Sequence, residues 1–406
     1  MTVTIDDIRA AAATIAGQVV RTPAVPAPRL AEATGAAAVV LKLENLQYTG
    51  SFKDRGAFNK LKSLSPAEAK NGVIAMSAGN HAQGVACFAQ RLGIPATIVM
   101  PQGTPFNKVE RTRGFGARVL IEGDTIDAAA VFAREVAKRE NLTFVHPYDD
   151  PRIVAGQGTI GLELMADVPD LDVILVPIGG GGIMAGIATA AKAINPRIEM
   201  IGVEAALYPS MHHAIRNLTP TFGAPTIAEG IAVKSPGALT KAIIERLVSD
   251  ILLVEEEPLE QAVQLMAETQ KVVAEGAGAA GLAAMLAHRQ RFAGRRVGIV
   301  VCGGNIDARV LGQVLLRGLV RDGRVVELRI GIVDQPGVLG RLARAIGEAG
   351  GNILEIHHQR LFTDLPVKRA DIDAVVETRN AAHVTEIMTS LSQAGFTVRQ
   401  LSSRSV

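Results

Sequence analysis

Apolar runs of strand length alternate with alanine-rich, helix-like stretches between about residues 70 and 302. The runs are rich in β-branched residues and apolar throughout, which is typical of parallel strands whose sheet is covered on both faces. A first series predicts strands at 72–76, 95–100 and 117–123 and helices at 81–93 and 127–140. A second series predicts strands at 171–178, 198–204 and 295–302 and a helix at 183–194. We therefore expect an α/β protein with two parallel-sheet domains.

The stretch FVHPYDDPRIVAGQG, residues 144–158, lies between the two series. Its proline and aspartate residues are typical of a connection rather than of a regular element. We expect this stretch to join the two sheet domains.

The last part of the chain has a different order of elements. It predicts strands at 325–333, 352–360, 371–378 and 396–401 and helices at 338–350 and 381–395. This βαββαβ order is the ferredoxin-like arrangement. We expect a separate domain over residues 325–406, with the hinge at RDGR, residues 321–324.

Composition and charge exclude several classes of protein. The 406 residues are 48% hydrophobic, with 41 glycines and no tryptophan, which is typical of a packed enzyme with two or three domains. The 42 basic and 40 acidic residues balance, so no broad basic face is expected for nucleic acid. Cys87 and Cys302 lack the spacing of a disulfide framework or a metal site. The first residues do not have the pattern of a signal peptide, and no run has the length of a membrane span, so we expect a cytoplasmic protein.

Two motifs, one before the first series and one within it, contain candidate functional residues. SFKDRGA, residues 51–57, holds Lys53, although a single lysine is more often a solvated surface charge than a reagent. SAGNHAQG, residues 77–84, lies where a predicted strand ends and a helix begins. The free N–H groups of such a junction bind anions, but the motif is also compatible with an ordinary helix cap that places His81 in the first turn.

Two further motifs follow predicted strands of the second series. PIGGGGIMAG contains Gly179–Gly182, and four consecutive glycines indicate that a ligand, most simply a phosphate, approaches the backbone itself. The run is not a Walker loop, but a dinucleotide site with Glu204 at the end of the next strand stays an alternative. VVCGGN places Cys302 at a strand end, where α/β sheets bind ligands, although a buried structural cysteine is the simpler interpretation.

The four motifs together fit pyridoxal 5'-phosphate. Its aldehyde requires a lysine, its phosphate requires N–H groups, and its ring requires partners for the hydroxyl and the nitrogen. In their order and spacing, SFKDRGA, SAGNHAQG, GGGGI and CGGN closely resemble the pyridoxal-phosphate enzymes of the tryptophan-synthase-β type (fold type II), specifically the threonine and serine dehydratases. The resemblance covers about residues 5 to 320.

The resemblance implies a role for each motif residue. Lys53 would bind the cofactor as an imine and act as the catalytic base, and Phe52 would flank the ring. Asn80 would bond the ring hydroxyl, and Cys302 would face the pyridine nitrogen. The phosphate would be held by Gly179, Gly180, Gly181, Gly182 and Ile183. The substrate carboxylate would be bound by the turn made of Ser77, Ala78, Gly79, Asn80 and His81.

The resemblance also implies the reaction. A thiol cannot protonate the pyridine as an aspartate would, so loss of the β-substituent is favoured over transamination. The freed Lys53 would remove the α-proton, and the β-hydroxyl would leave, protonated through the cofactor phosphate. The expected function is a threonine ammonia-lyase that converts L-threonine to 2-oxobutanoate and ammonia, and also L-serine to pyruvate. The resemblance implies a catalytic domain over residues 1–320, with a smaller subdomain at about 46–146 inserted in it.

Three alternatives stay open at this stage. Racemases of this type have a serine directly before the GN of the SxGN turn, where this chain has Ala78, so dehydration is favoured over serine racemisation. No motif marks the side-chain pocket, so a hydroxyaspartate dehydratase is not excluded, nor is a non-enzymatic amino-acid sensor. VEAALYPS keeps Glu204 but lacks the later carboxylate of the racemase metal site, so no metal ligand is assigned and only a monovalent cation stays open.

The C-terminal unit resembles an ACT domain, with DQPGVL at its first loop and GGNIL before its second strand. Paired ACT domains bind amino acids near that loop, which would place Asp334, Gly337 and Asn352 near an effector. Dimerisation without a ligand is the alternative. The resemblance implies a dimer or tetramer, and it leaves a biosynthetic role, in isoleucine formation, and a catabolic role equally open.

Overall fold

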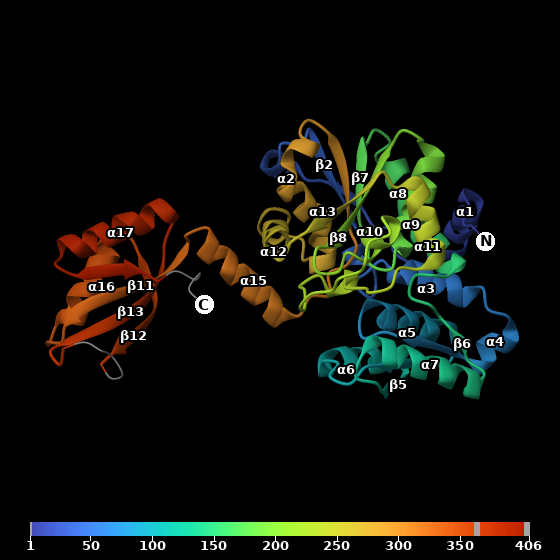
Figure 1. The fold of residues 1–406 in the computed structure, drawn as a ribbon, viewed down its shortest axis with the longest axis horizontal. Helices are drawn as coiled ribbons and strands as arrows, with labels where there is room; N and C mark the ends of the chain where they lie inside the picture. Colours follow the sequence, from blue (N-terminus) through green and yellow to red (C-terminus); the bar gives the residue numbers. More distant parts are fainter. Residues whose placement is uncertain (1, 361–365, 402–406) are drawn as a thin grey trace. The chain divides into compact units, whose positions relative to one another are not determined.

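The computed structural model describes residues 2–360 and 366–401. The chain divides into two compact units, Met1–Ile306 and Asp307–Val406. The first unit contains two sheets with their helices, and the second contains one sheet (Figure 1). Within the described ranges, no helix is long and apolar enough to cross a membrane.

The larger sheet of the first unit has the strand order β1-β2-β10-β7-β8-β9. Its strands are parallel except for β1, which pairs antiparallel with β2. The parallel arrangement predicted from the second series is confirmed, and β2 and β9 extend the sheet beyond the predicted strands. The strands are β1 (Ala24–Pro26), β2 (Ala38–Leu43), β7 (Val173–Pro177), β8 (Glu199–Ala205), β9 (Asp250–Val254) and β10 (Arg296–Val301).

Helices cover both faces of the larger sheet. Added side-chain atoms at Gly298 of β10 would meet Leu164 of α8, whereas the next residue, Ile299, lies against Gly281 of α13. Because successive strand residues point to opposite faces, α8 and α13 lie on opposite sides of the sheet. The α-helices associated with this sheet are α1 (Ile5–Ile15), α2 (Pro28–Thr34), α8 (Pro151–Asp167), α9 (Gly182–Ile194), α10 (Ser210–Ile215), α11 (Ala238–Leu247), α12 (Glu256–Leu265), α13 (Gly276–Ala287) and α14 (Arg289–Phe292). Shorter helical turns are η1 (Glu44–Leu46), η2 (Glu229–Ile231) and η3 (Met266–Gln270).

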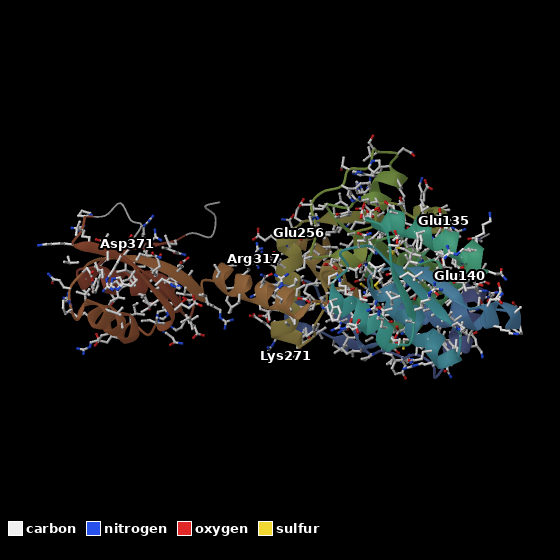
Figure 2. The ribbon with its side chains drawn as sticks, turned by 90° about the horizontal axis from the view of Figure 1, so that it is seen from below. Glu135, Glu140, Glu256, Lys271, Arg317 and Asp371 are labelled. Carbon is white, nitrogen blue, oxygen red and sulfur yellow. The ribbon has the colours of Figure 1, made fainter. Side chains whose placement is uncertain are left out.

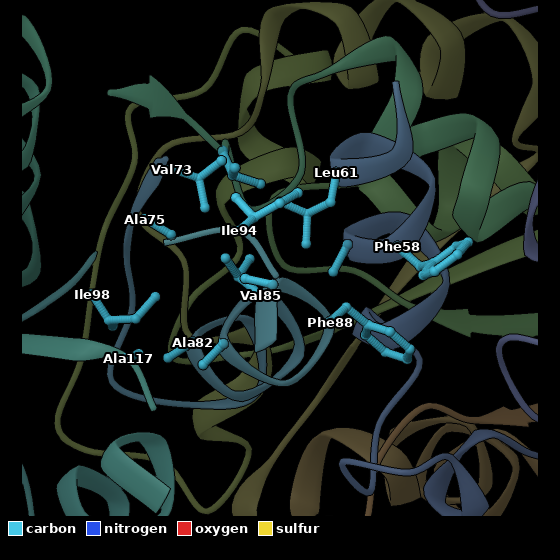
Figure 3. Close-up of a cluster of buried hydrophobic side chains, with 14 of the residues drawn as sticks. Phe58, Leu61, Val73, Ala75, Ala82, Val85, Phe88, Ile94, Ile98 and Ala117 are labelled. Atoms are coloured by element: carbon cyan, nitrogen blue, oxygen red, sulfur yellow. The ribbon is translucent and has the colours of Figure 1, made fainter. Parts of the chain in front are cut away.

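The smaller sheet is parallel throughout and has the strand order β5-β4-β3-β6. Ala75 and Ile98 face a cluster that includes Val85 and Phe88 of α5 (Figure 3). Ile74 and Val99 face the opposite cluster, which packs under α7. The elements are β3 (Val73–Met76), β4 (Ala96–Met100), β5 (Arg118–Ile121), β6 (Thr143–Phe144), α3 (Lys53–Lys62), α4 (Pro66–Asn71), α5 (Asn80–Leu92), α6 (Phe106–Gly114) and α7 (Ile126–Glu140).

Helix α7 shows how the charged residues are distributed on such a covering helix. Ala129, Ala133 and Val136 are buried against the sheet, while Glu135 and Glu140 lie on the side away from it (Figure 2). Glu140 pairs at this surface with Arg118 at 2.8 Å. The apolar stripe of the helix therefore faces the sheet, as expected for an amphipathic helix.

The prediction that residues 144–158 are a connection was wrong for the second half of that range. Helix α8 begins at Pro151, which occupies the first helical position, where its missing N–H group carries no cost. Asp150 caps this helix, because its carboxylate accepts hydrogen bonds from the N–H groups of Arg152 at 2.8 Å and Ile153 at 3.2 Å. The proline and aspartate residues thus mark the start of a helix, and within this range only residues 145–150 form a connection.

The second unit has the βαββαβ order that the sequence predicts, preceded by helix α15. Its sheet is antiparallel with the strand order β12-β13-β11-β14. Alternate residues of β11 and β13 are buried with apolar residues of the two helices in a separate core. The elements are α15 (Ala308–Arg321), β11 (Val325–Val333), α16 (Val338–Glu348), β12 (Asn352–Gln359), β13 (Arg369–Glu377), α17 (Ala381–Gln393) and β14 (Thr397–Gln400).

Candidate active site

Lys53 is the first residue of α3, and the turn before it is bonded to the end of β10. The N–H group of Phe52 donates to the carbonyl oxygen of Cys302 at 3.0 Å, and that of Gly304 donates to the carbonyl oxygen of Gly50 at 2.9 Å. These hydrogen bonds bring the SFKDRGA and CGGN motifs together, although they lie far apart in the sequence. The lysine is therefore placed beside the cysteine at the carboxyl edge of the larger sheet.

The amine of Lys53 lies inside the protein rather than in bulk solvent. Its Nζ donates a hydrogen bond to the carbonyl oxygen of Pro147 at 2.7 Å and lies 5.1 Å from the ring centre of Phe52. Burial lowers the pKa of Lys53 to about 8, because a charged ammonium is costly in this environment. At that pKa a substantial fraction of the amine is neutral, and therefore nucleophilic, at slightly alkaline pH.

A small cavity lies over Lys53, and the space in it that the centre of a water-sized sphere can occupy is about 30 Å³. Eight of the predicted cofactor-binding residues line it, as do five residues from other segments. The predicted ones are Phe52, Lys53, Gly179, Gly180, Gly181, Gly182, Ile183 and Cys302. The others are Pro147, Tyr148, Pro177 and Ile231.

Gln157 of α8 is the fifth of these residues from outside the predicted motifs. Asn80 and the other residues of the Ser77–His81 turn do not line this cavity. Lys53, the tetraglycine run and Cys302 thus share one space, as the motifs predict, and the carboxylate turn lies beside it.

The tetraglycine run forms the start of α9, and its geometry requires glycine. Gly181 caps the helix with φ +93°, a left-handed conformation that side chains disfavour, and no side chain caps the first N–H groups. A Cβ atom at Gly180 would lie 2.2 Å from the ring of Tyr148, and one at Gly181 would lie 2.8 Å from Oγ1 of Thr240. The uncapped N–H groups and the helix dipole therefore provide an anion-binding position.

Cys302 lies at the end of β10 and is 3% exposed. Burial raises the pKa of its thiol well above the ordinary value, and Glu275 raises it further. The side chain therefore stays a neutral thiol at physiological pH, which can exchange a weak hydrogen bond but supplies no charge.

Asn80 is held by a chain of side-chain hydrogen bonds. Its Nδ2 donates to Oε1 of Glu275 at 2.8 Å, and its Oδ1 accepts from Nδ2 of Asn305 at 2.8 Å. Asn305 is itself bonded to the carbonyl oxygen of Thr49 at 2.7 Å. These contacts fix the orientation of the Asn80 amide and leave one Nδ2 hydrogen for another acceptor.

The turn Ser77–His81 leads into α5. Oγ of Ser77 accepts from the N–H group of Gly79 at 3.1 Å, and no side chain caps the first N–H groups of the helix. This uncapped helix start is compatible with the predicted carboxylate contact. His81 is buried, and its Nε2 lies 2.9 Å from the carbonyl oxygen of Val145. Burial lowers the pKa of His81 to about 3, so the ring is neutral and would contribute no charge to that contact.

Sequence reasoning did not identify Tyr148, Gln157 and Glu275. Tyr148 lies against the tetraglycine run and donates its hydroxyl to the carbonyl oxygen of Ser235 at 2.8 Å. Burial raises the pKa of Glu275 to about 7. Only Gln157 had a usable sequence signal, because it is a polar residue among the small and apolar residues of VAGQGTIG. This segment lies in the buried helix α8.

Glu204, the acidic residue of the dinucleotide alternative, does not line the cavity. Its carboxylate accepts from the N–H groups of Met211 at 2.8 Å and His212 at 2.9 Å, at the start of α10. Burial raises its pKa to about 7. In the part of the chain that the structure describes, no group of three or more His, Cys, Asp or Glu side chains is placed to hold a metal ion.

The predicted effector residues lie in the second unit. The Asp334 carboxylate pairs with Nε and Nη2 of Arg360 at 3.0 and 3.2 Å, and Gly337 caps α16 with φ +84°. Asn352 begins β12 opposite Glu377, which in turn pairs with Val325 at the start of β11, whereas Asp334 follows the other end of β11. A strand rises by about 3.3 Å per residue. Within one chain, the length of β11 therefore separates Asn352 at one end from Asp334 and Gly337 at the other.

Comparison with known proteins identifies the family. Residues 15–303 match the family of pyridoxal-phosphate dependent enzymes, and residues 326–405 match the ACT domain. The chain is 44% identical over 399 residues to the L-threonine ammonia-lyase of Thermotoga maritima, which covers 98% of this chain and 99% of that protein. The chain therefore belongs to the family of pyridoxal-phosphate-dependent enzymes and ends in an ACT domain.

Solved structures agree with this assignment. Maize serine racemase matches with a TM-score of 0.73 and 34% identity, covering 79% of this chain and 99% of that one. The processed form of threonine deaminase isoform 2 from Solanum lycopersicum matches with a TM-score of 0.71 and 33% identity, covering 76% and 92%. The resemblance found in the motifs is confirmed, and the dinucleotide alternative is excluded by the family.

The residues of the cavity fit pyridoxal phosphate. The Lys53 amine suits the aldehyde, and the uncapped start of α9, where added Cβ atoms would collide with neighbours, suits the phosphate. Cys302 offers a neutral partner for the ring nitrogen. Asn80, which is not part of the cavity lining, keeps a free donor for the ring hydroxyl. Bound there, the cofactor would supply an electron-withdrawing ring that acidifies the α-carbon of an amino acid.

Proposed function

We propose that the chain is an L-threonine ammonia-lyase that releases 2-oxobutanoate and ammonia, and that it also converts L-serine to pyruvate. The observation that carries this proposal is that the Lys53 amine, the tetraglycine run and the Cys302 thiol line one cavity. The named activity of the full-length Thermotoga maritima relative supports the same substrate. We propose as well a cytoplasmic catalytic domain over residues 1–320, with the smaller subdomain inserted at about 46–146.

Lys53 is the base in this proposal. Its Nζ accepts the proton from the substrate α-carbon, which requires the neutral amine that the lowered pKa of Lys53, about 8, makes available. The carbonyl oxygen of Pro147, 2.7 Å from Nζ, orients the amine in the cavity. The N–H groups at the start of α5 hold the substrate carboxylate, as the Ser77–His81 turn carries no side-chain cap.

Two side chains direct the outcome toward elimination. The neutral thiol of Cys302 places no acid at the ring nitrogen, which disfavours transamination. Ala78 has no hydroxyl with which to return a proton to the α-carbon from the side opposite Lys53, which disfavours racemisation.

A steady-state assay of 2-oxo acid release with L-threonine, L-serine and hydroxyaspartate tests the proposal. We expect the highest kcat/KM for L-threonine and no D-serine from L-serine. Formation of D-serine as the main product, or no 2-oxo acid from any of the three, would contradict the proposed reaction.

The ACT domain supports a regulatory proposal. We infer that an amino-acid effector binds near Asp334, Gly337 and Asn352. Because β11 separates Asn352 from the other two within one chain, one site that contains all three requires a second chain. This requirement supports a homo-oligomer, either a dimer or a tetramer.

A further inference from the structure

The side-chain amide of Gln157 has a defined orientation. Gln157 lies in α8 and is 1% exposed. Its Oε1 accepts a hydrogen bond from the N–H group of Gly56, near the start of α3, at 3.2 Å. Because a backbone N–H group can only donate, the oxygen must be on this side, and Nε2 is fixed on the other.

The Nε2 group of Gln157 has no hydrogen-bond partner among the described residues, although it is fully buried. Gln157 lines the cavity that also contains Lys53 and the tetraglycine run. A buried amide without an acceptor is costly, so such a group in a binding cavity indicates a ligand that accepts its hydrogens.

Small residues allow the Gln157 amide to reach this position. A Cβ atom at Gly56 would lie 2.4 Å from Nε2 of Gln157, and one at Gly156 would lie 2.7 Å from Cα of Gly56. Helices α3 and α8 therefore approach each other closely only because both positions are glycine. The close approach places the amide against the helix whose first residue is Lys53.

Gln157 also lies beside the start of α9. Its neighbours in α8, Val154 and Gly158, face Gly186, where an added Cβ atom would lie 2.4 Å from the Val154 oxygen and 2.6 Å from the Gly158 nitrogen. Gly186 is one helical turn from Gly182, the first residue of α9. The amide thus lies between the helix of Lys53 and the helix whose uncapped start suits an anion.

We propose that Nε2 of Gln157 donates a hydrogen bond to the phosphate of the cofactor and completes an anion site that the tetraglycine run forms only in part. The N–H groups at the start of α9 are donors as well, so an acceptor-rich anion satisfies both these groups and the Gln157 amide. The ring hydroxyl and the ring nitrogen have other proposed partners, Asn80 and Cys302. This inference rests on the proposed position of the phosphate, but it does not depend on which amino acid is the substrate.

Gln157→Glu is the first variant, because it keeps an oxygen for the Gly56 N–H group and replaces the donor by a second carboxylate oxygen, which also repels an anion. The dissociation constants of pyridoxal phosphate and of pyridoxal, which has no phosphate, are measured on the cofactor-free chain by absorbance titration at pH 8. We expect affinity for pyridoxal phosphate to fall by about tenfold or more, and affinity for pyridoxal to change by less than about twofold.

Gln157→Met is the second variant, since methionine has a similar size and no hydrogen-bond donor, and the same selective loss is expected. Gln90→Glu, which makes the same change on the exposed side of α5, is the control and should leave both constants unchanged. Equal losses for the two compounds, or no loss for pyridoxal phosphate, would overturn the inference and reduce Gln157 to a cap of α3. A wild-type chain that bound neither compound would instead contradict the proposed function itself.

Discussion

Arg55 and Glu44 form a fully buried ion pair with two hydrogen bonds, directly behind the turn that carries Lys53. Nε of Arg55 lies 2.8 Å from Oε2 of Glu44, and Nη2 lies 2.7 Å from Oε1. The same guanidinium contacts Glu163 of α8 at 2.7 and 2.8 Å, and Glu163 also pairs with the buried Lys42 of β2. This network joins α3 to β2 and α8, so it fixes the helix whose first residue is Lys53.

Glu44→Gln should destabilise the protein strongly, because it leaves the Arg55 guanidinium buried with one of its two carboxylates removed. Burial alone would raise the pKa of Glu44, but Arg55 lowers it below the ordinary value, so the carboxylate is ionised in the folded state. Loss of one partner of a buried ion pair costs about 3–5 kcal/mol. Urea unfolding measures this cost, and Glu110→Gln, in the exposed pair with Arg113, is the matched control. Equal, small effects of the two variants would show that the buried pair does not hold the turn.

Incorporation of pyridoxal phosphate into the cofactor-free chain should depend on pH through Lys53. The pKa of Lys53 is lowered to about 8 by burial, and only the neutral amine attacks an aldehyde. The rate constant should therefore rise with pH up to about 8 and level off above it. Stopped-flow absorbance measures the rate, with Lys53→Ala giving the background from other lysines. A rate that still rises tenfold per pH unit up to about 10 would assign the ordinary lysine pKa to this group.

Glu275→Gln should change how the stability of the cofactor-free chain depends on pH. Burial raises the pKa of Glu275 to about 7 from an ordinary value of 4.5, so the folded state keeps a proton that the unfolded chain has released. The stabilising contribution of this proton is complete below about pH 4.5 and is lost as pH rises through 7. The variant keeps an acceptor for Asn80 and lacks the titration.

Thermal unfolding between pH 4.5 and 8 measures this difference. Relative to the variant, the wild-type chain should lose stability as pH rises and show no further loss above about 7. Glu135→Gln, on the exposed side of α7, is the control that should follow the wild-type profile. Parallel profiles for wild type and Glu275→Gln would mean that folding does not raise the pKa of Glu275.

Gly337→Ala should weaken the response to an amino-acid effector while leaving basal activity unchanged. Gly337 has φ +84°, which side chains disfavour, so alanine would distort the loop that Asp334 begins. Inhibition curves for isoleucine, valine and threonine on the full chain measure the effect. Gly340→Ala, in the same helix and with open space around its Cα atom, is the control. An unchanged inhibition constant would place the effector away from this loop.

The sequence predicted the parts of this protein that depend on local chemistry. The alternation of apolar runs with helices is visible without tertiary structure and indicated the correct class of fold. The four adjacent glycines are visible in the same way and indicated a ligand at the backbone. Ser77–His81 and Gly179–Gly182 were visible because strand ends and helix starts leave backbone groups free.

The remainder depends on contacts between distant segments. Gln157 and Glu275 reach the motif residues only after α8 and α13 pack against other elements, and no local pattern marks either contact. Residues 151–158 of the predicted connection were misjudged because proline and aspartate are typical of a helix start as well as of a loop. The separation of Asn352 from Asp334 follows from strand register, which the sequence of a single chain does not contain.

The central claim is that Lys53 is the residue that binds the cofactor. The most direct measurement is reduction of the chain loaded with pyridoxal phosphate by borohydride, followed by peptide mapping with mass spectrometry. The account predicts that the pyridoxyl group is found on Lys53, and that Lys53→Ala carries no label and has no visible cofactor absorbance. A label on a different lysine, with Lys53 unmodified, would contradict it.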